Sequence, residues 1–128
     1  MVLATDWRQS YDIKEEIVGV ALALSGLFDV EPLQYTKVNG WLNIDAEGAR
    51  RNSPIRHIPG RSTARLIAAV GGRETAEFQR QTADYAAAWQ AAGHDCRVVP
   101  MPGYNHFDIA LSLSDPNGAL CRAVLAAL

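Results

Sequence analysis

The apolar run IVGVALAL, residues 17–24, constrains the fold of this chain more than any other feature. The run does not alternate apolar with polar residues, and it stops at the break Ser25-Gly26. A short continuous run of this kind is typical of a strand that is covered on both faces, and such strands belong to parallel sheets. Because the chain has 128 residues, it has room for one hydrophobic core, and we expect a single domain, 1–128.

The next segments alternate between helix and strand. Prolines and glycines are spread through 27–60, which predicts a helical, cap-like excursion made of short turns. Residues 66–70 form a second apolar run. Apolar side chains then recur at helical spacing through 75–92, with Thr75 as the expected N-cap and Gly93 as the stop.

Residues 96–99 predict a third strand, followed by a turn at 100–103 and a final helix that runs to Leu128. The order of elements predicts an α/β fold with about three parallel strands and crossover helices. The first strand is apolar enough to be central, yet no strand precedes it in this sequence. Since an exposed apolar edge promotes aggregation, we expect a second copy of the chain or another polypeptide to cover it.

Composition limits the classes of function. Twelve basic and 14 acidic residues, without runs of like charge, give no basic surface for nucleic acid or an anionic membrane. The N-terminal residues become charged too early for a signal peptide, and residues 17–24 are too few to span a bilayer, so we expect a cytoplasmic protein. Cys96 and Cys121 have no metal-binding spacing, and we read them as plain thiols.

Two polar segments follow predicted strands, at the edge where open α/β sheets bind their ligands. Glu74 lies in the loop after the second strand, two residues past Gly71-Gly72, and His106 lies in the loop after the third. Because adjacent strands are about 5 Å apart, these two side chains can meet above the sheet. A carboxylate in contact with a histidine can fix the imidazole tautomer and stabilise the imidazolium.

The sequence resembles the C-terminal part of the α/β-hydrolases that include arylformamidases (kynurenine formamidases) and related carboxylesterases. The likeness extends from LATDWR to the end of the chain, and its most specific elements are EF-x-RQ after the acid and NHFD around the histidine. The resemblance implies that Glu74 is the acid and His106 the base of a Ser-His-Asp/Glu triad. Glu77 is the rival acid. The family's GxSxG elbow and HGG loop are absent from this sequence, and Ser25 lacks the first glycine of the elbow.

The resemblance therefore implies a hydrolase of carboxylic ester or aryl-formamide bonds whose serine is supplied by sequence outside this chain. It implies no metal and no organic cofactor. The alternative is an inactive truncated or split remnant that folds as a homo-oligomer or with a chain supplying the missing N-terminal half. Four aromatic residues are candidates to bind the small-molecule substrate, and each is equally plausible as a packing residue. They are Phe28, Tyr104, Phe107 and Trp41.

Overall fold

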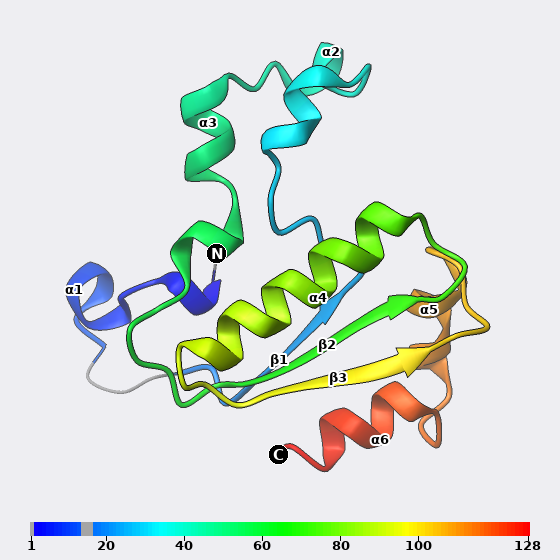
Figure 1. Ribbon diagram of the computed structural model, residues 1–128. Coiled ribbons are helices and arrows are strands. Elements are labelled where there is room, and N and C mark those ends of the chain that lie inside the picture. The colour runs from blue at the N-terminus through cyan, green and yellow to red at the C-terminus, as the bar shows by residue number, and fades with distance from the viewer. Residues whose placement is uncertain (1, 14–16) are drawn as a thin grey trace.

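The computed structural model describes residues 2–13 and 17–128. In these residues a parallel sheet has the strand order β1-β2-β3 (Figure 1), formed by β1 (Val20–Leu24), β2 (Arg65–Gly71) and β3 (Cys96–Met101). The predicted α/β class with three parallel strands is confirmed.

The register brings the carboxyl ends of the strands to one edge of the sheet. Leu24 at the end of β1 is aligned with Ala69, and Gly71 at the end of β2 is aligned with Met101. The amide of Ser25 continues the ladder by donating to the Ala69 carbonyl at 2.8 Å. Residues that follow the three strands are therefore neighbours in space, although they lie far apart in the sequence.

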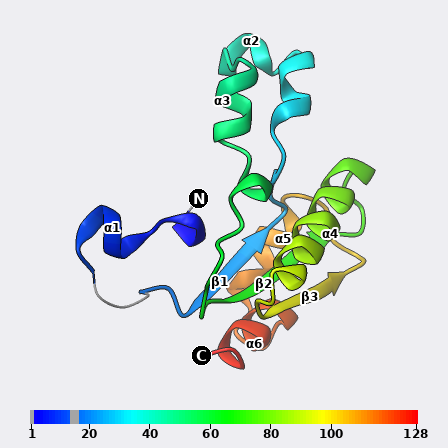
Figure 2. The same ribbon diagram turned by 60° about the vertical axis from the view of Figure 1, so that its left-hand side comes forward.

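Helices cover both faces of the sheet (Figures 1 and 2). One face packs against α4 (Ala76–Ala91), and the other packs against α5 (Asp108–Leu111) and α6 (Ala119–Leu125). β2 contributes side chains to the cores on both faces of the sheet, because Leu66 packs on the α4 side while Ile67 packs on the α6 side. This double coverage explains why the strand reads as a continuous apolar run.

The predicted apolar face of α4 forms the core on its side of the sheet. Tyr85 and Trp89 pack there with Leu66 and Phe28, and Trp89 is fully buried. The helix ends as expected, with Gly93 after its last turn at φ +83°, a left-handed conformation that favours glycine. Thr75 is at the N-cap position, but its side chain makes no capping hydrogen bond.

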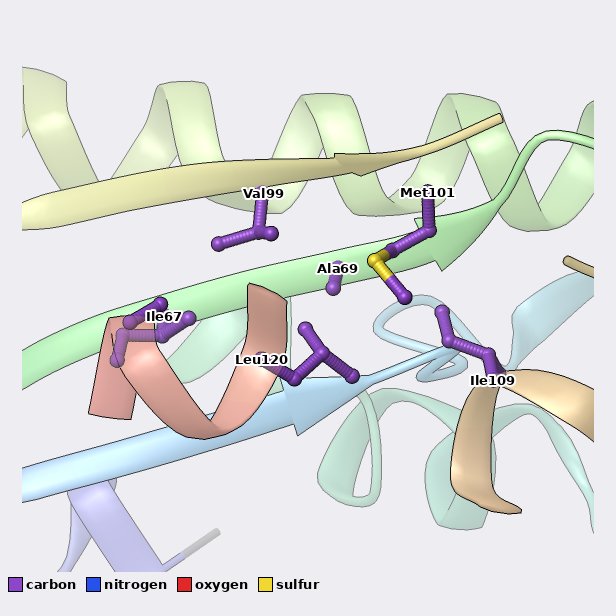
Figure 3. Close-up of a cluster of buried hydrophobic side chains, with 7 residues drawn as sticks. Ile67, Ala69, Val99, Met101, Ile109 and Leu120 are labelled. Carbon is purple, nitrogen blue, oxygen red and sulfur yellow. The ribbon is translucent and has the colours of Figure 1, made fainter. Parts of the chain in front are cut away.

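The second core fills the space between the sheet and the C-terminal helices (Figure 3). Its buried members come from β2, β3, α5 and α6 and are Ile67, Ala69, Val99, Met101, Ile109, Leu120 and Ala123. Half-buried side chains of β1, among them Leu22 and Leu24, pack at its margin. β1 is thus an edge strand whose apolar side chains are only partly covered.

Three predicted elements differ from the structure. Of the first apolar run, 17–24, only Val20–Leu24 forms a strand. The expected single C-terminal helix is divided into α5 and α6 by a 3-10 turn, Ser112–Ser114, and a bend through Pro116 and Gly118. Proline cannot donate a helical hydrogen bond, and glycine is a weak helix former. The third strand runs past Val99 to Met101, with Pro100 inside it, which an edge strand such as β3 tolerates.

The segment 27–60 forms short helical turns. Figures 1 and 2 show α2 and α3 in an arm that projects away from the sheet. The elements of the segment 27–60 are η2 (Glu31–Tyr35), α2 (Asn39–Leu42), α3 (Ala46–Arg51) and η3 (Pro54–His57). Before the sheet, the chain forms η1 (Val2–Ala4) and α1 (Trp7–Tyr11). The cap-like role of the excursion stays a prediction.

Among the described residues, no helix has the length and apolar character needed to cross a membrane.

Two tryptophans provide a matched test of the α4 core. Trp89 is 0% exposed and Trp41 is 87% exposed. We expect Trp89→Ala to lower the free energy of unfolding by about 3–5 kcal/mol, because it removes a large side chain from a packed core. Trp41→Ala should change it by less than about 0.5 kcal/mol. Urea unfolding followed by circular dichroism measures both, and equal effects would contradict the packing described.

Candidate active site

Glu74 and His106 meet at the carboxyl edge of the sheet. Glu74 lies in the loop between β2 and α4, and His106 lies in the loop between β3 and α5. His106 Nδ1 is 2.7 Å from Glu74 Oε2. Because an ionised carboxylate can only accept, Nδ1 carries the proton of this hydrogen bond. The structure thus brings together the two residues that the sequence singled out.

The Glu74 side chain is only 1% exposed and is surrounded by donors. Its Oε1 accepts a hydrogen bond from the Ser25 hydroxyl at 2.5 Å and another from the Gly71 amide at 2.7 Å. Burial raises the pKa of this carboxyl group, but these bonds and the one from His106 favour the ionised form. The net effect places the pKa of Glu74 below its ordinary value.

The imidazole of His106 contacts two aromatic rings. Its centroid is 4.9 Å from that of Phe78 and 5.6 Å from that of Phe107, which meets it edge-on. The side chain is 48% exposed. Since Nδ1 is engaged with Glu74, the tautomer leaves the lone pair of Nε2 to take up a proton. This arrangement suits a general base that is oriented by a carboxylate.

Gly71 and Gly72 allow the two loops to approach each other. A Cβ at Gly71 would overlap the Tyr104 carbonyl oxygen, and one at Gly72 would lie 2.7 Å from the Pro102 carbonyl oxygen. The Arg73 amide donates to that same Tyr104 oxygen at 3.0 Å. Neither glycine has a positive φ. The pair is therefore needed for close backbone approach rather than for a special turn conformation.

The rival acid Glu77 is engaged elsewhere. It accepts hydrogen bonds from Arg80 at 2.7 and 3.0 Å and from Gln81 at 2.8 Å. These bonds, with that from Arg80 the stronger influence, lower the pKa of Glu77 to about 2. The geometry therefore favours Glu74 as the partner of His106.

Gln81 is a structural member of the site region that sequence reasoning did not single out. It is 3% exposed, and its Oε1 accepts from the backbone amides of Phe28 and Asp29 at 2.7 and 2.8 Å. Its Nε2 donates to the Asp29 carbonyl at 2.9 Å and to Glu77. The EF-x-RQ element thus fixes the loop that follows β1. In the sequence, the available indication of this role was that the last residue of EF-x-RQ, a glutamine, stands at a core-facing position of an amphipathic helix.

The predicted substrate-binding aromatics have different surroundings. Phe28 is buried and stacks on Tyr85, with ring centroids 4.1 Å apart and an interplanar angle of 5°. Phe107 is 77% exposed beside His106, and Tyr104 is exposed in the same loop. Trp41 is exposed on α2 in the projecting arm. The structure places Phe107 against the histidine and Tyr104 in the same loop, and the binding roles stay predictions.

The other two histidines make backbone contacts. His94 is buried against Trp89, and its Nε2 is 2.6 Å from the Pro59 carbonyl oxygen. His57 Nε2 is 3.0 Å from the Arg51 carbonyl oxygen. No group of three or more His, Cys, Asp or Glu side chains that could bind a metal ion is present in residues 2–13 and 17–128.

Known proteins with a similar fold are esterase-type enzymes. A putative thioesterase from Silicibacter sp. TM1040 matches 84% of this chain with a TM-score of 0.71 and 27% identity, and the match covers 38% of that protein. An esterase from Thermogutta terrifontis, phosphoramylated by tabun, matches 69% of the chain and 31% of its own length, with a TM-score of 0.51. At 19% identity, this second likeness concerns the fold alone. The chain has the architecture of part of an α/β-hydrolase.

The sequence comparisons name particular relatives, although no family model matches. The chain is 34% identical to the kynurenine formamidase of Danio rerio and 33% identical to that of Salmo salar, in each case over 98% of its length. It spans 43% and 44% of these two proteins. The resemblance found in the sequence is confirmed: over nearly its whole length the chain is similar to kynurenine formamidases.

Gly71→Ala tests the contact between the two loops. The added methyl group overlaps the Tyr104 carbonyl, so we expect a loss of about 1–3 kcal/mol in the free energy of unfolding. The signal of the His106 Nδ1 proton in NMR spectra should also weaken, because the loops separate. Gly103→Ala is the control, since its Cβ would meet no atom within 4 Å. Equal behaviour of the two variants would contradict the close approach.

The lowered pKa of Glu74 predicts a dependence of stability on pH. The ionised carboxylate stabilises the fold above the pKa of a glutamate in the unfolded chain, about 4.3. This stabilisation is lost as the pH falls through the lower pKa of the folded state. We expect the free energy of unfolding of Glu74→Gln to fall less on acidification than that of the wild type. Urea unfolding from neutral to acidic pH measures this, and identical slopes would disprove it.

Proposed function

We propose that this chain supplies the acid and the base of a hydrolase that acts on carboxylic ester or aryl-formamide bonds. The observation that carries the proposal is the hydrogen bond of 2.7 Å between His106 Nδ1 and Glu74 Oε2. It joins an exposed imidazole to a buried, ionised carboxylate, as in the acid-histidine half of a serine hydrolase triad. The similarity to kynurenine formamidases supports this choice of substrate class.

In this proposal the nucleophilic serine comes from residues outside these 128. Its hydroxyl oxygen attacks the carbonyl carbon of the substrate while Nε2 of His106 takes the hydroxyl proton. Glu74 stabilises the resulting imidazolium through Nδ1. His106 then gives the proton to the departing alkoxide or amine as the carbon–oxygen or carbon–nitrogen bond breaks, which leaves an acyl-serine.

A water molecule completes the cycle. His106 takes one proton from the water, the hydroxide oxygen attacks the acyl carbon, and the serine oxygen departs with the proton that His106 returns. The products are a carboxylic acid and an alcohol or amine, so atoms and charge balance. In the proposed formamidase reaction the acid is formate and the amine is aromatic.

The exposed edge of β1 favours a partner for this chain. An apolar groove of about 610 Å³ runs beside that strand. Its lining includes Val20 and Leu22 of β1 and Val124 and Leu125 of α6. In the leading proposal the polypeptide that carries the serine covers this edge. The alternative is a remnant without activity, which covers the same edge by forming an oligomer or by binding another chain.

Complementation tests the proposed function. The chain is assayed with p-nitrophenyl acetate and N-formylkynurenine, alone and together with the part of the Danio rerio relative that it does not match. We expect turnover in the mixture, and a loss of about 10⁴-fold or more with His106→Ala or Glu74→Gln, because these replacements remove the base and its orienting carboxylate.

Two control variants address the rival residues. Glu77→Gln and His57→Ala should keep most of the activity, because Glu77 is paired with Arg80 and His57 contacts the Arg51 carbonyl. Turnover that survives His106→Ala would count against the assignment of the base. Absence of turnover in every mixture, with an oligomer detected by sedimentation, would favour the remnant.

A further inference from the structure

Ser25 lies at the end of β1 with a backbone conformation that serine rarely adopts. Its φ is 47°, in the left-handed region, and only 8% of the residue is exposed. Strained residues of this kind persist where surrounding contacts fix them, and they are concentrated at functional sites. The contacts of Ser25 therefore indicate what its conformation serves.

The hydroxyl of Ser25 is directed at the carboxylate of Glu74. It donates to Oε1 at 2.5 Å, while His106 engages Oε2 at 2.7 Å. Ser25 follows β1, Glu74 follows β2 and His106 follows β3, so a continuous chain of hydrogen bonds crosses the ends of all three strands. The Gly71 amide shares Oε1 at 2.7 Å.

The loop that contains Ser25 is fixed on both sides. The Ser25 amide donates to the Ala69 carbonyl at 2.8 Å. The ring of Phe28 lies over Gly26, where a Cβ would be 2.5 Å from the ring. Gln81 in turn holds the Phe28 amide at 2.7 Å. The hydroxyl is thus presented to Glu74 by a turn that these contacts hold in place.

We propose that Ser25 is a positioning residue whose hydroxyl holds the Glu74 carboxylate in the orientation that presents Oε2 to His106. The Gly71 amide also donates to Oε1, and the Ser25 hydroxyl adds a second donor there, which further restricts rotation of the carboxylate about its last bond. Because Glu74 is buried, each of its oxygens also requires a donor in place of water. This role deepens the proposed hydrolase function and rests on it.

The same geometry separates Ser25 from the nucleophile of the proposed reaction. A nucleophilic hydroxyl faces Nε2 of the histidine, on the side of the ring opposite Nδ1. The Ser25 hydroxyl instead bonds to the oxygen of Glu74 that His106 does not engage. Ser25 therefore supports the acid and leaves the position of the nucleophile open.

Two substitutions separate the hydroxyl from the backbone strain. Ser25→Ala and Ser25→Gly both remove the hydroxyl, but only glycine adopts a positive φ without strain. The pKa of Glu74 is measured in the 128-residue chain by ¹³C NMR of the carboxyl group. We expect it to rise by about one unit in both variants, the effect of losing one hydrogen bond to a charged group. Ser114→Ala, at an exposed serine, should leave it unchanged.

Neither substitution of Ser25 changes the charged groups around Glu74, so these groups cannot account for a difference in its pKa. His106 is the ionisable group in contact with it, and Glu77, in the first turn of α4, is paired with Arg80. An unchanged Glu74 pKa in both variants would overturn the proposal. A rise in Ser25→Ala that is absent in Ser25→Gly would also overturn it, because backbone strain would then be the cause.

Enzyme activity provides a second, independent test of the role of Ser25. In the complemented enzyme we expect both variants to lower kcat about tenfold with little change in KM, since an interaction that acts in the transition state is weakened. An unchanged kcat would overturn the positioning role. If the wild-type mixture shows no turnover, the hydrolase function fails, whereas the NMR titration still decides whether Ser25 holds Glu74.

Discussion

The buried carboxylate of Glu74 is the interaction on which the carboxyl edge of this molecule depends. It accepts hydrogen bonds from Ser25 and His106, which follow the two outer strands, and from Gly71 at the end of its own strand. A buried anion with fewer donors would be costly, because it would have lost its water without compensation. The three strand-end loops therefore have to approach one another, and the glycines at 71 and 72 make that approach sterically possible.

The two layers of helices serve this edge in different ways. α4 fixes the loop after β1 through Gln81, and it places Phe78 against the imidazole of His106. α5 and α6 complete the second core, in which Met101 and Ile109 hold the two ends of the loop that carries His106. The site is thus supported by both cores, whereas the edge of β1 and the projecting arm are supported much less.

Part of the fold and of the candidate site could be predicted from the pattern of residues. The apolar runs predicted the parallel strands, the spacing of Tyr85 and Trp89 predicted the buried face of α4, and the strand-end positions of Glu74 and His106 predicted that they would meet. The final helix was predicted too long, because the alanine- and leucine-rich tail obscured the break around Pro116. The part played by Gln81 was missed, since a polar residue within a helix gives no indication of which distant backbone it will contact.

Local chemistry accounts for what the sequence by itself determined: the fold class, the helix stop at Gly93, and a carboxylate and a histidine on neighbouring loops. The tertiary structure alone decided that the rival Glu77 is bonded to Arg80 and Gln81, and that the hydroxyl of Ser25 is directed at the carboxylate of Glu74. It also decided that Gly71 is needed for space and not for its conformational freedom. The physical reason is that these contacts join residues up to 49 positions apart, whose distances are set by strand register and helix packing rather than by neighbours in the chain.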